Sequence, residues 1–405
     1  MTQTAFTNTL YTNDNLFILN GLNSDLVDLI YLDPPFNSKR FYSAPIGSKA
    51  AGSSFKDMWT WQDVDEEYLN TLAENYPVLT DFIAAIGVIH SKAMAAYLTY
   101  MAQRIVEMHR VLKDTGSLYL HCDQTAGHYL KVVLDNIFGK NNFRNEIVWC
   151  YKSGGASKKC FSKKHDTIYF YTKSDKWFFN FEKEKSYGQT GGGQGGKVQY
   201  FKDDRGTYSM AGIKDWWEIS MLSTTHPERT GYPTQKPLAL LQRIIKASSN
   251  KGDIILDPFC GCATTCVAAQ QLDRKWIGID IEKQAANILI ERLSDDAGLF
   301  KEFIHTTLIP QRTDVQVVKP TKSVKERLYK KQNGLCNACG TEFDIWNLEI
   351  DHIRPRSKGG ADCYENYQLL CSHCNRMKSD NPMESLRLKI ATRKKLLKEK
   401  ITFGE

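Results

Sequence analysis

Short apolar runs and helical patterns alternate along the chain before residue 300. Runs typical of buried strands occur at 27–32, 117–122, 143–151, 167–172, 253–256 and 275–279. Apolar positions recur at helical spacing at 90–112, 129–138, 237–248 and 263–272. Strands that alternate with helices in this way predict an α/β protein with a doubly wound, mostly parallel sheet.

Three stretches interrupt this alternation. Residues 38–54 are polar and contain glycine, so we expect a mobile loop there. Residues 152–230 combine glycine runs with many lysines and aromatic residues, which indicates an inserted, loop-rich segment. The stretch 306–325 is typical of a linker. We therefore predict a first domain at 1–305, followed by a linker, a small domain and a basic C-terminal helix at 306–325, 326–385 and 386–405.

The positive charge is concentrated in the last part of the chain. Residues 319–405 hold 18 Lys and Arg and 11 Asp and Glu, so they carry the whole formal net charge of +7. A basic module suits a polyanion such as DNA, although a solvated basic tail would have the same composition. The Lys-rich helix expected at 386–400 could lie along phosphates.

The cysteines and the hydropathy of the chain indicate in which cellular compartment the protein is expected. The eleven cysteines are an odd number in a lysine-rich chain, which favours reduced thiols or metal ligands over disulfides. The chain has no apolar run of 18 residues, and its first residues lack the pattern of a secretory signal. We expect a cytoplasmic protein, encoded by a bacterium or phage, that does not enter membranes.

Residues 253–280 have the pattern of a nucleotide-type binding unit. The strand at 253–256 delivers Asp257 to the carboxyl edge of the sheet, and a turn with Gly261 brings backbone N–H groups toward a ligand. The next strand ends at Asp280, where a ribose hydroxyl pair would be held. Phe259 could flank an adenine ring. An ordinary strand–turn–helix corner would show the same pattern, because one glycine does not make a G-x-G-x-x-G motif.

Several motifs resemble the β class of amino-methyltransferases, which use S-adenosylmethionine. Residues 257–265 are similar to the D-P-F-x-G-S-G-T-T element of this class, with Cys262 replacing Ser and Ala263 replacing the second Gly. If that glycine needed a positive φ, cofactor affinity would suffer. Further elements resemble D-P-P-Y/F, H-P-T-Q-K-P and G-D-N-L at 33–36, 231–237 and 12–16. The catalytic motif precedes the cofactor motif, which is the order of the β class.

The resemblance implies a methyltransferase fold and a role for each motif. An exocyclic amine is a poor nucleophile, and the Asp33 carboxylate and Pro34 carbonyl would accept its two N–H bonds and aim its lone pair at the methyl group. Pro35 would keep this corner rigid, and Phe36 would stack on a base flipped out of the duplex. The residues implied to hold the cofactor are Asp14, Thr234, Lys236, Asp257, Phe259, Gly261, Thr264 and Asp280.

The same resemblance suggests the substrate. Asp at position 33 favours adenine N6 over cytosine N4, because enzymes of the second type more often carry Ser there. The inserted segment 152–230 would then recognise the DNA target, and its lysines and aromatic residues suit groove and phosphate contacts.

Two C-x-x-C pairs near the C-terminus predict a metal site. Four thiolates are the usual ligands of a closed, tetrahedral zinc site. The implied ligands are Cys336, Cys339, Cys371 and Cys374. The residues between and after the pairs resemble the zinc-stapled HNH endonucleases, which fold as a β-hairpin and a helix around one catalytic metal.

This second resemblance assigns a nuclease chemistry. His352 would be the general base that activates water against a phosphodiester. Asp351 and Asn375 would bind a divalent ion such as Mg²⁺, which stabilises the leaving oxygen. Asn366 would brace the hairpin and orient His352. A zinc module that only binds DNA would carry the same cysteines.

The sequence is compatible with three interpretations. In the first, one chain both methylates and cleaves double-stranded DNA, as a single-chain restriction–modification protein would. In the second, the zinc module only docks DNA, and in the third a nucleic-acid-binding protein keeps an inactive methyltransferase fold. The intact Asp33 and Asp257 argue against the third, and the intact Asp351 and His352 argue against the second. The HNH resemblance favours DNA over RNA, and a homodimer is a candidate assembly.

Overall fold

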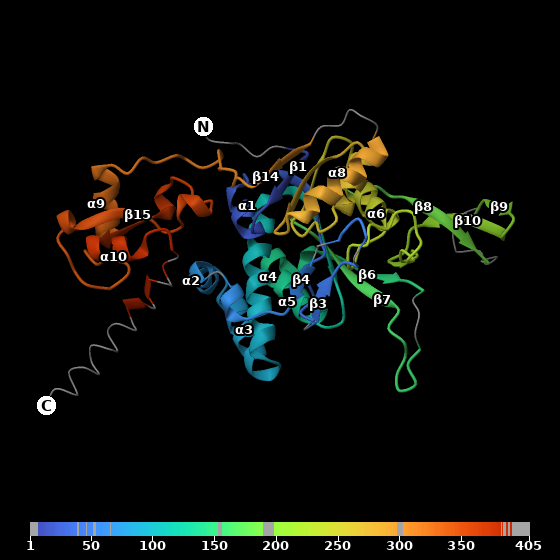
Figure 1. Ribbon diagram of the computed structural model, residues 1–405, viewed down its shortest axis with the longest axis horizontal. Coiled ribbons are helices and arrows are strands. Elements are labelled where there is room, and N and C mark those ends of the chain that lie inside the picture. Colours follow the sequence, from blue (N-terminus) through green and yellow to red (C-terminus); the bar gives the residue numbers. More distant parts are fainter. Residues whose placement is uncertain are drawn as a thin grey trace.

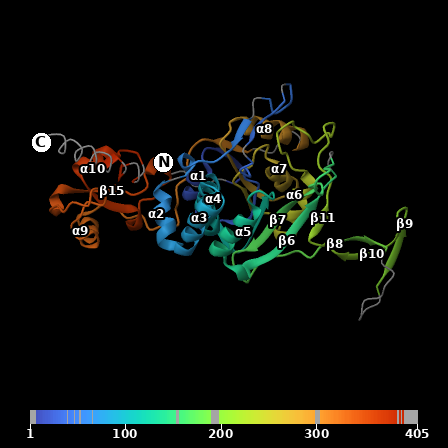
Figure 2. The same cartoon turned by 90° about the horizontal axis from the view of Figure 1, so that it is seen from below.

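The computed structural model describes residues 7–390, apart from 39, 46, 52–53, 65, 153–155, 189–197, 298–302, 382, 384–385 and 388. A large α/β body holds most of these residues, and a small module formed by 322–378 lies at one end of it (Figure 1). A second, smaller sheet projects from the opposite end (Figure 2).

A nine-stranded sheet forms the centre of the large body, in the order β11-β6-β7-β5-β2-β12-β13-β1-β14. Within this sheet only β7 runs antiparallel to its neighbours, so the predicted doubly wound, mostly parallel sheet is confirmed. The strands are β1 (Thr9–Thr12), β2 (Val27–Leu32), β5 (Leu112–Cys122), β6 (Phe143–Cys150), β7 (His165–Thr172), β11 (Trp216–Glu218), β12 (Ile254–Asp257), β13 (Lys275–Asp280) and β14 (Ile304–Thr306).

Helices cover both faces of this sheet, and each layer has its own apolar core. One face carries α1 (Asn15–Gly21), α2 (Glu66–Asn75), α3 (Pro77–Ile89), α4 (Lys92–Val111) and α5 (Gly127–Leu134). The other face carries α6 (Leu238–Ser248), α7 (Thr264–Gln271) and α8 (Gln284–Ala297). Short 3-10 turns lie at Trp61–Asp63, Lys140–Asn142, Ile345–Asn347, Arg356–Lys358 and Tyr364–Asn366, and a π turn at Asp135–Gly139 extends α5.

The segment expected to be a mobile loop at 38–54 forms a hairpin at its two ends. Strand β3 (Arg40–Ser43) pairs antiparallel with β4 (Ser54–Asp57). These strands are too short and too polar to show the alternation of a half-buried strand. The hairpin follows the Asp-Pro-Pro-Phe motif directly, so it lies beside the expected catalytic corner.

The inserted segment expected at 152–230 is more regular than its composition indicates. Strands β7 and β11 belong to the central sheet, and a three-stranded sheet of order β8-β10-β9 forms between them in sequence. Its strands are β8 (Lys183–Tyr187), β9 (Tyr200–Asp203) and β10 (Gly206–Gly212). Most of their residues are exposed or half-buried. A sheet that buries neither face leaves no apolar alternation in the sequence, which explains why the pattern missed it.

The C-terminal module has the predicted hairpin and helix. Strand β15 (Leu348–His352) pairs antiparallel with β16 (Tyr367–Cys371), which continues into α10 (Ser372–Lys378). Helix α9 (Lys322–Lys331) packs against β16 and begins inside the segment expected to be a linker. A small core formed by Leu328, Leu348, Leu369 and Leu370 holds these elements together.

The first part of the predicted linker is attached to the large body. Strand β14 pairs with β1, and Asn23 and Thr313 exchange two hydrogen bonds of 2.8 Å. The backbone N–H of Ser24 donates to the Asp314 carboxylate at 2.9 Å. On the other side, the Val318 carbonyl accepts from the Tyr367 hydroxyl at 2.7 Å. The linker is therefore bonded to the body at one end and to the module at the other.

Two expectations concern the chain's ends and its hydropathy. The basic helix predicted at 386–405 lies almost entirely outside the described residues, and it stays a prediction. Within the described part of the chain, we find no helix that is both long enough and apolar enough to span a bilayer.

The substitution Gly21→Ala tests the attachment of the segment 304–314. A Cβ at Gly21 would stand 1.9 Å from the Pro310 carbonyl oxygen, so that segment would have to move away. We expect the free energy of unfolding to fall by about 1–3 kcal/mol, the usual cost of overpacking, and amide exchange at 307–314 to accelerate. Gly87→Ala in α3 is the control, because its Cβ would meet Ala95 at an ordinary 3.4 Å. Equal exchange in the two variants would contradict the attachment.

Candidate functional site

A cavity of about 500 Å³ opens at the carboxyl edge of the central sheet, where β2, β12 and β13 end. The carboxyl ends of parallel strands converge at one edge, and ligands of doubly wound proteins bind there. The cavity brings together every residue that the methyltransferase motifs predict: Asp14, Asp33, Pro34, Pro35, Phe36, Thr234, Lys236, Asp257, Phe259, Gly261, Thr264 and Asp280.

The two carboxylate oxygens of Asp33 have different surroundings. Oδ2 accepts a hydrogen bond from the Lys236 ammonium, and both side chains are largely buried. Oδ1 is buried and has no hydrogen-bond partner among the described residues. An oxygen in this state can accept an N–H donor that enters the cavity, and leaving it without a partner is costly. The Lys236 ammonium also lies 5.6 Å from the centroid of the Phe36 ring.

Lys236 has a different partner from the one that the motif implies. The sequence predicted a contact from Thr234 or Lys236 to the cofactor, whereas the Lys236 ammonium is bonded to the expected catalytic acid. Thr234 lines the same cavity and has a positive φ of 63°. The two partners of the ion pair are 203 positions apart, so no local pattern could have revealed it.

Asp57 fixes the chain as it leaves the diproline corner. Its carboxylate accepts the backbone N–H groups of Asn37 at 2.6 Å and Ser38 at 2.9 Å. Asp57 is 1% exposed, and Asn37 has a φ of 60°. Charge-assisted bonds of this kind are stronger than neutral ones. The β3–β4 hairpin therefore holds the catalytic corner through a residue that the sequence analysis missed.

The turn after β12 is held against the end of β13. The backbone N–H groups of Gly261 and Glu282 donate to the two oxygens of Asp280 at 2.7 and 2.8 Å. The N–H of Phe259 donates to Asp257 at 3.1 Å. Burial raises the pKa of Asp257 to about 7 and that of Asp280 to about 6. A cationic ligand in this cavity would favour the charged forms of both acids.

Ala263, which replaces the second glycine of the motif, has the left-handed backbone conformation that glycine would adopt more easily. Its φ is 58° and its ψ is 33°, at the N-terminus of α7. The buried Arg292 of α8 donates to the Cys262 carbonyl at 2.7 Å and to the Thr264 hydroxyl at 2.9 Å. The turn is thus braced on both sides of a strained residue.

Arg104 joins three parts of the cavity wall, and the sequence analysis did not single it out. It is 2% exposed and donates to Asp14 at 2.9 Å and to the Asn15 amide oxygen at 2.5 Å. Asn15 donates in turn to the Pro258 carbonyl at 2.8 Å. Asp14 also caps α1 by accepting from the Leu16 N–H. The carboxylate of Asp14 therefore serves the fold as well as lining the cavity.

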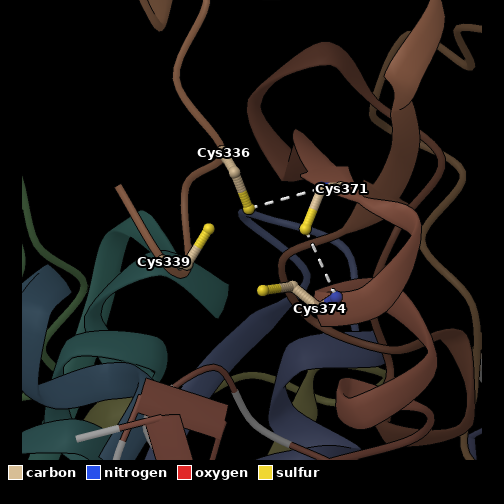
Figure 3. Close-up of side chains that lie close together, drawn as sticks. All are labelled: Cys336, Cys339, Cys371 and Cys374. Atoms are coloured by element: carbon tan, nitrogen blue, oxygen red, sulfur yellow. Dashed lines mark hydrogen bonds between the residues drawn. The ribbon is translucent and has the colours of Figure 1, made fainter. Parts of the chain in front are cut away.

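The four cysteines of the C-terminal module converge (Figure 3). Their sulfur atoms all lie within 4.8 Å of one another. Zinc–sulfur bonds of about 2.3 Å in a tetrahedron place the sulfurs about 3.8 Å apart, so this group fits such an ion. The N–H of Cys371 donates to the Cys336 sulfur at 3.3 Å. No other cluster of three or more His, Cys, Asp or Glu side chains in the described residues meets this criterion.

His352 has a carboxylate partner that the motif did not predict. Its Nε2 lies 2.7 Å from Asp362 Oδ1, and Arg356 donates two bonds of 2.7 Å to the same carboxylate. Asn366 spans the loop after His352 by accepting the Arg354 N–H at 2.8 Å and donating to the Ala361 carbonyl at 2.9 Å. That geometry suits the bracing role expected for Asn366.

The two residues expected to hold the divalent ion each have another partner. The Asp351 Oδ2 atom lies 3.0 Å from the ammonium of the buried Lys378. The Asn375 amide donates to Glu349 at 2.5 Å. Glu349 and Asp351 are two positions apart in β15, so their side chains lie on the same face of the hairpin. Glu349 is therefore an additional acid beside the expected ion site.

The substitution Ala263→Gly tests the strained turn. A left-handed conformation costs an L-residue about 1–2 kcal/mol, and glycine loses about 0.5–1 kcal/mol more chain entropy than alanine on folding. We therefore expect the free energy of unfolding to rise by up to about 1 kcal/mol in denaturant titrations. Ala268→Gly in the interior of α7 is the control, and it should lower the same quantity. A loss of stability in both variants would show that Ala263 is not strained.

Comparison with known proteins agrees with the geometry of both modules. A family model described as DNA methylase matches residues 27–291, and one described as HNH endonuclease matches 336–381. The type II methyltransferase M.EcaI of Enterobacter cloacae is 27% identical over 374 residues, covering 75% of this chain and 73% of that protein. The DNA adenine methyltransferase YhdJ of Escherichia coli is 28% identical over 288 residues, covering 70% and 82%.

A third relative is the type II methyltransferase M.HpaI of Haemophilus parainfluenzae, which is 33% identical over 207 residues, 50% of this chain and 62% of that protein. The resemblances inferred from the motifs are thereby confirmed. The C-terminal module is an HNH domain. Since the methylase model spans more than half of the sequence, the chain belongs to the DNA methylase family.

Proposed function

We propose that this protein is a site-specific DNA methyltransferase that transfers a methyl group from S-adenosylmethionine to N6 of an adenine flipped out of double-stranded DNA. The observation that carries this proposal is the buried, unpartnered Oδ1 of Asp33 at the cavity. The name of YhdJ, a DNA adenine methyltransferase, supports adenine, as does Asp at position 33. Cytosine N4 is the alternative, since its amine poses the same chemical problem.

The cavity fits the cofactor. Its volume of about 500 Å³ lies within the usual range of small-molecule sites, about 300–1,000 Å³. S-adenosylmethionine, when bound, supplies an electrophilic methyl group on a positively charged sulfur. Asp257 is a buried acid and Asp280 is a half-buried one. Both would gain from a nearby cation, and Asp280 lies where ribose hydroxyls would be held. Phe259 would flank the adenine of the cofactor.

The residues of the catalytic corner orient the target amine. Asp33 Oδ1 and the Pro34 carbonyl would accept its two N–H groups, and the prolines hold both acceptors still. Lys236 holds the other oxygen of Asp33, so the carboxylate keeps one orientation. As the new N–C bond formed, the bond between the methyl carbon and the sulfonium sulfur would break, and positive charge would develop on the amine nitrogen next to a preorganised carboxylate before one N–H proton is lost to solvent. Phe36 offers the face on which the base would stack.

The small sheet β8-β10-β9 is the part of 152–230 that we assign to target recognition. It projects from the body beside the central sheet (Figure 1). Lys185 lies 4.4 Å from the Tyr208 ring centroid, and Lys202 is exposed on β9. Lys185 is also paired with Asp203 at 2.7 Å, so the exposed Lys202 is the better candidate for a contact to phosphate.

We further propose that the HNH domain cleaves DNA, so that the chain combines the two activities of a restriction–modification system. The pair His352–Asp362 favours this over simple docking, because a carboxylate orients an imidazole that acts as a general base. Zinc would be held by the four cysteines as a structural ion. A divalent ion such as Mg²⁺ would be held by Asp351 and Asn375, beside Glu349, and would stabilise the leaving oxygen.

Substitution of Asp33 tests methyl transfer. Asp33→Ala should lower the methylation rate by about 10² or more, because it removes a preorganised acceptor from the transition state. Modified-base sequencing of DNA from cells expressing each variant measures this. The control is Asp175→Ala, an exposed acid after β7. A motif-specific N6-methyladenine signal that persists in Asp33→Ala would refute the assignment, and a signal at cytosine N4 in the wild type would establish the alternative.

Substitution of His352 tests cleavage. Unmethylated plasmid incubated with Mg²⁺ should be cut by the wild type, and His352→Ala should slow cutting by about 10²-fold or more, the usual contribution of a general base. His373→Ala is a matched control, since His373 is exposed on α10 in the same domain. If wild type and His352→Ala behave alike on the plasmid, the nuclease proposal fails.

A further inference from the structure

A buried polar chain crosses four strands beside the catalytic corner. The Tyr31 hydroxyl on β2 lies 2.9 Å from Nδ1 of His121 on β5. Nε2 of the same ring lies 3.2 Å from Oδ2 of Asp166 on β7. The Tyr151 hydroxyl, which follows β6, donates to Oδ1 of Asp166 at 3.0 Å. His121 is 0% exposed and Tyr31 is 2% exposed, whereas Asp166 and Tyr151 at the other end are half-buried.

Asp166 sets the direction of these hydrogen bonds. Burial acts to raise the pKa of Asp166, but the hydrogen bond from His121, together with the nearby charge of Lys236 and the hydrogen bond from Tyr151, brings the pKa below its usual value. The carboxylate therefore only accepts, so Nε2 of His121 carries the ring hydrogen. In the neutral form of the imidazole this leaves Nδ1 as the acceptor for the Tyr31 hydroxyl. A single acid thus fixes the tautomer of His121 and the rotamer of Tyr31.

This chain of hydrogen-bonded side chains supports both sides of the expected target pocket. Tyr31 lines the cavity and precedes Asp33 by two residues, and residues at this spacing in a strand lie on the same face. The His121 ring lies 6.2 Å from the Phe36 ring at an angle of 30°, and Trp149 packs edge-on at 5.5 Å against it. Movement of His121 would therefore move the support of the stacking face and the neighbour of the catalytic acid together.

Asp166 also acts on the partner of Asp33. The charge of Lys236 contributes to the lowered pKa of Asp166, which places the ammonium within electrostatic reach of both acids. Asp166 does not line the cavity itself. Any effect on the reaction must then pass through His121, Tyr31 or Lys236.

We propose that Asp166 is a positioning residue for methyl transfer, which acts through His121 to hold Tyr31 and the support of Phe36 where the target amine meets Asp33. This deepens the proposed function on its target side, and it holds for either acceptor base. A misplacement of about 1 Å costs about 10²-fold in rate when geometry limits the reaction. We therefore expect a selective loss in the methyl-transfer step, with cofactor binding preserved.

The test compares Asp166→Asn with a matched variant that weakens a hydrogen bond to the other end of β7. The asparagine side chain has the same size as aspartate, but its amide can donate or accept and no longer imposes one tautomer on His121. The control is Asp135→Asn, which weakens a similar bond, from the Tyr171 hydroxyl to Asp135 at 2.7 Å, away from the cavity. Single-turnover methylation of a DNA duplex and calorimetric titration with S-adenosylmethionine are measured for each protein, together with thermal midpoints.

We expect Asp166→Asn to slow single-turnover methylation by about 10-fold to 100-fold, with a dissociation constant for S-adenosylmethionine within about twofold of the wild type. Tyr31→Phe, which removes one hydroxyl, should show the same pattern with a smaller loss. Asp135→Asn should shift the thermal midpoint without changing the rate of single-turnover methylation.

Three results would overturn the inference. Asp166→Asn could methylate at the wild-type rate, it could lose cofactor affinity as much as rate, or the control could lose rate to the same extent. The last two would indicate a general structural role. A wild-type protein that does not bind S-adenosylmethionine in the same titration would instead refute the proposed function.

Discussion

A carboxylate that must accept hydrogen bonds from a neutral amine has to be dry, fixed in orientation and open on one side. The ion pair between Asp33 and Lys236 holds one oxygen, and the other oxygen is buried without a partner in a residue that lines the cavity. The remaining features of the large body serve this arrangement. The diproline corner limits the backbone, Asp57 holds the residues that follow, and the parallel strands bring the cofactor turn to the same edge.

The cavity wall depends on two buried arginines that join separate elements. Arg104 ties α4 to α1 and, through Asn15, to the turn after β12, while Arg292 ties α8 to the other end of that turn. Removing one partner of a buried pair costs about 3–5 kcal/mol, because the other charge stays behind without compensation. A site built in this way is rigid, and its rigidity comes from residues that do not touch the substrate.

The sequence predicted the parts of the site that depend on strand ends. Asp33, Asp257 and Asp280 each follow an apolar run, and the parallel sheet alone brings them together. Lys236, Asp57 and Arg104 could not be assigned in this way, since their partners are distant in the chain and depend on the packed fold. Ala263 is an intermediate case, because the missing glycine raised the question and only the backbone angles answered it.

The small sheet and the HNH domain show two further limits of prediction. Strands β8, β9 and β10 bury neither face, so they lack the pattern by which strands are recognised. In the HNH domain the cysteine spacing predicted the converging sulfurs, whereas Glu349 and Asp362 lie outside the motif letters. Residues of this kind can be recognised only in the structure, where the folded domain brings them beside the motif residues.

Strand β14 has a consequence for any attempt to separate the methylase body from the HNH domain. It covers the outer side of β1, and the chain leaves from it toward the HNH domain. A methylase shortened to end before residue 304 would expose the unpaired N–H and C=O groups of β1, and uncovered edges of this kind recruit other chains into aggregates. The shortest soluble methylase should therefore extend through the bonds of Thr313 and Asp314, because the segment that leads to the HNH domain also covers the edge of the methylase sheet.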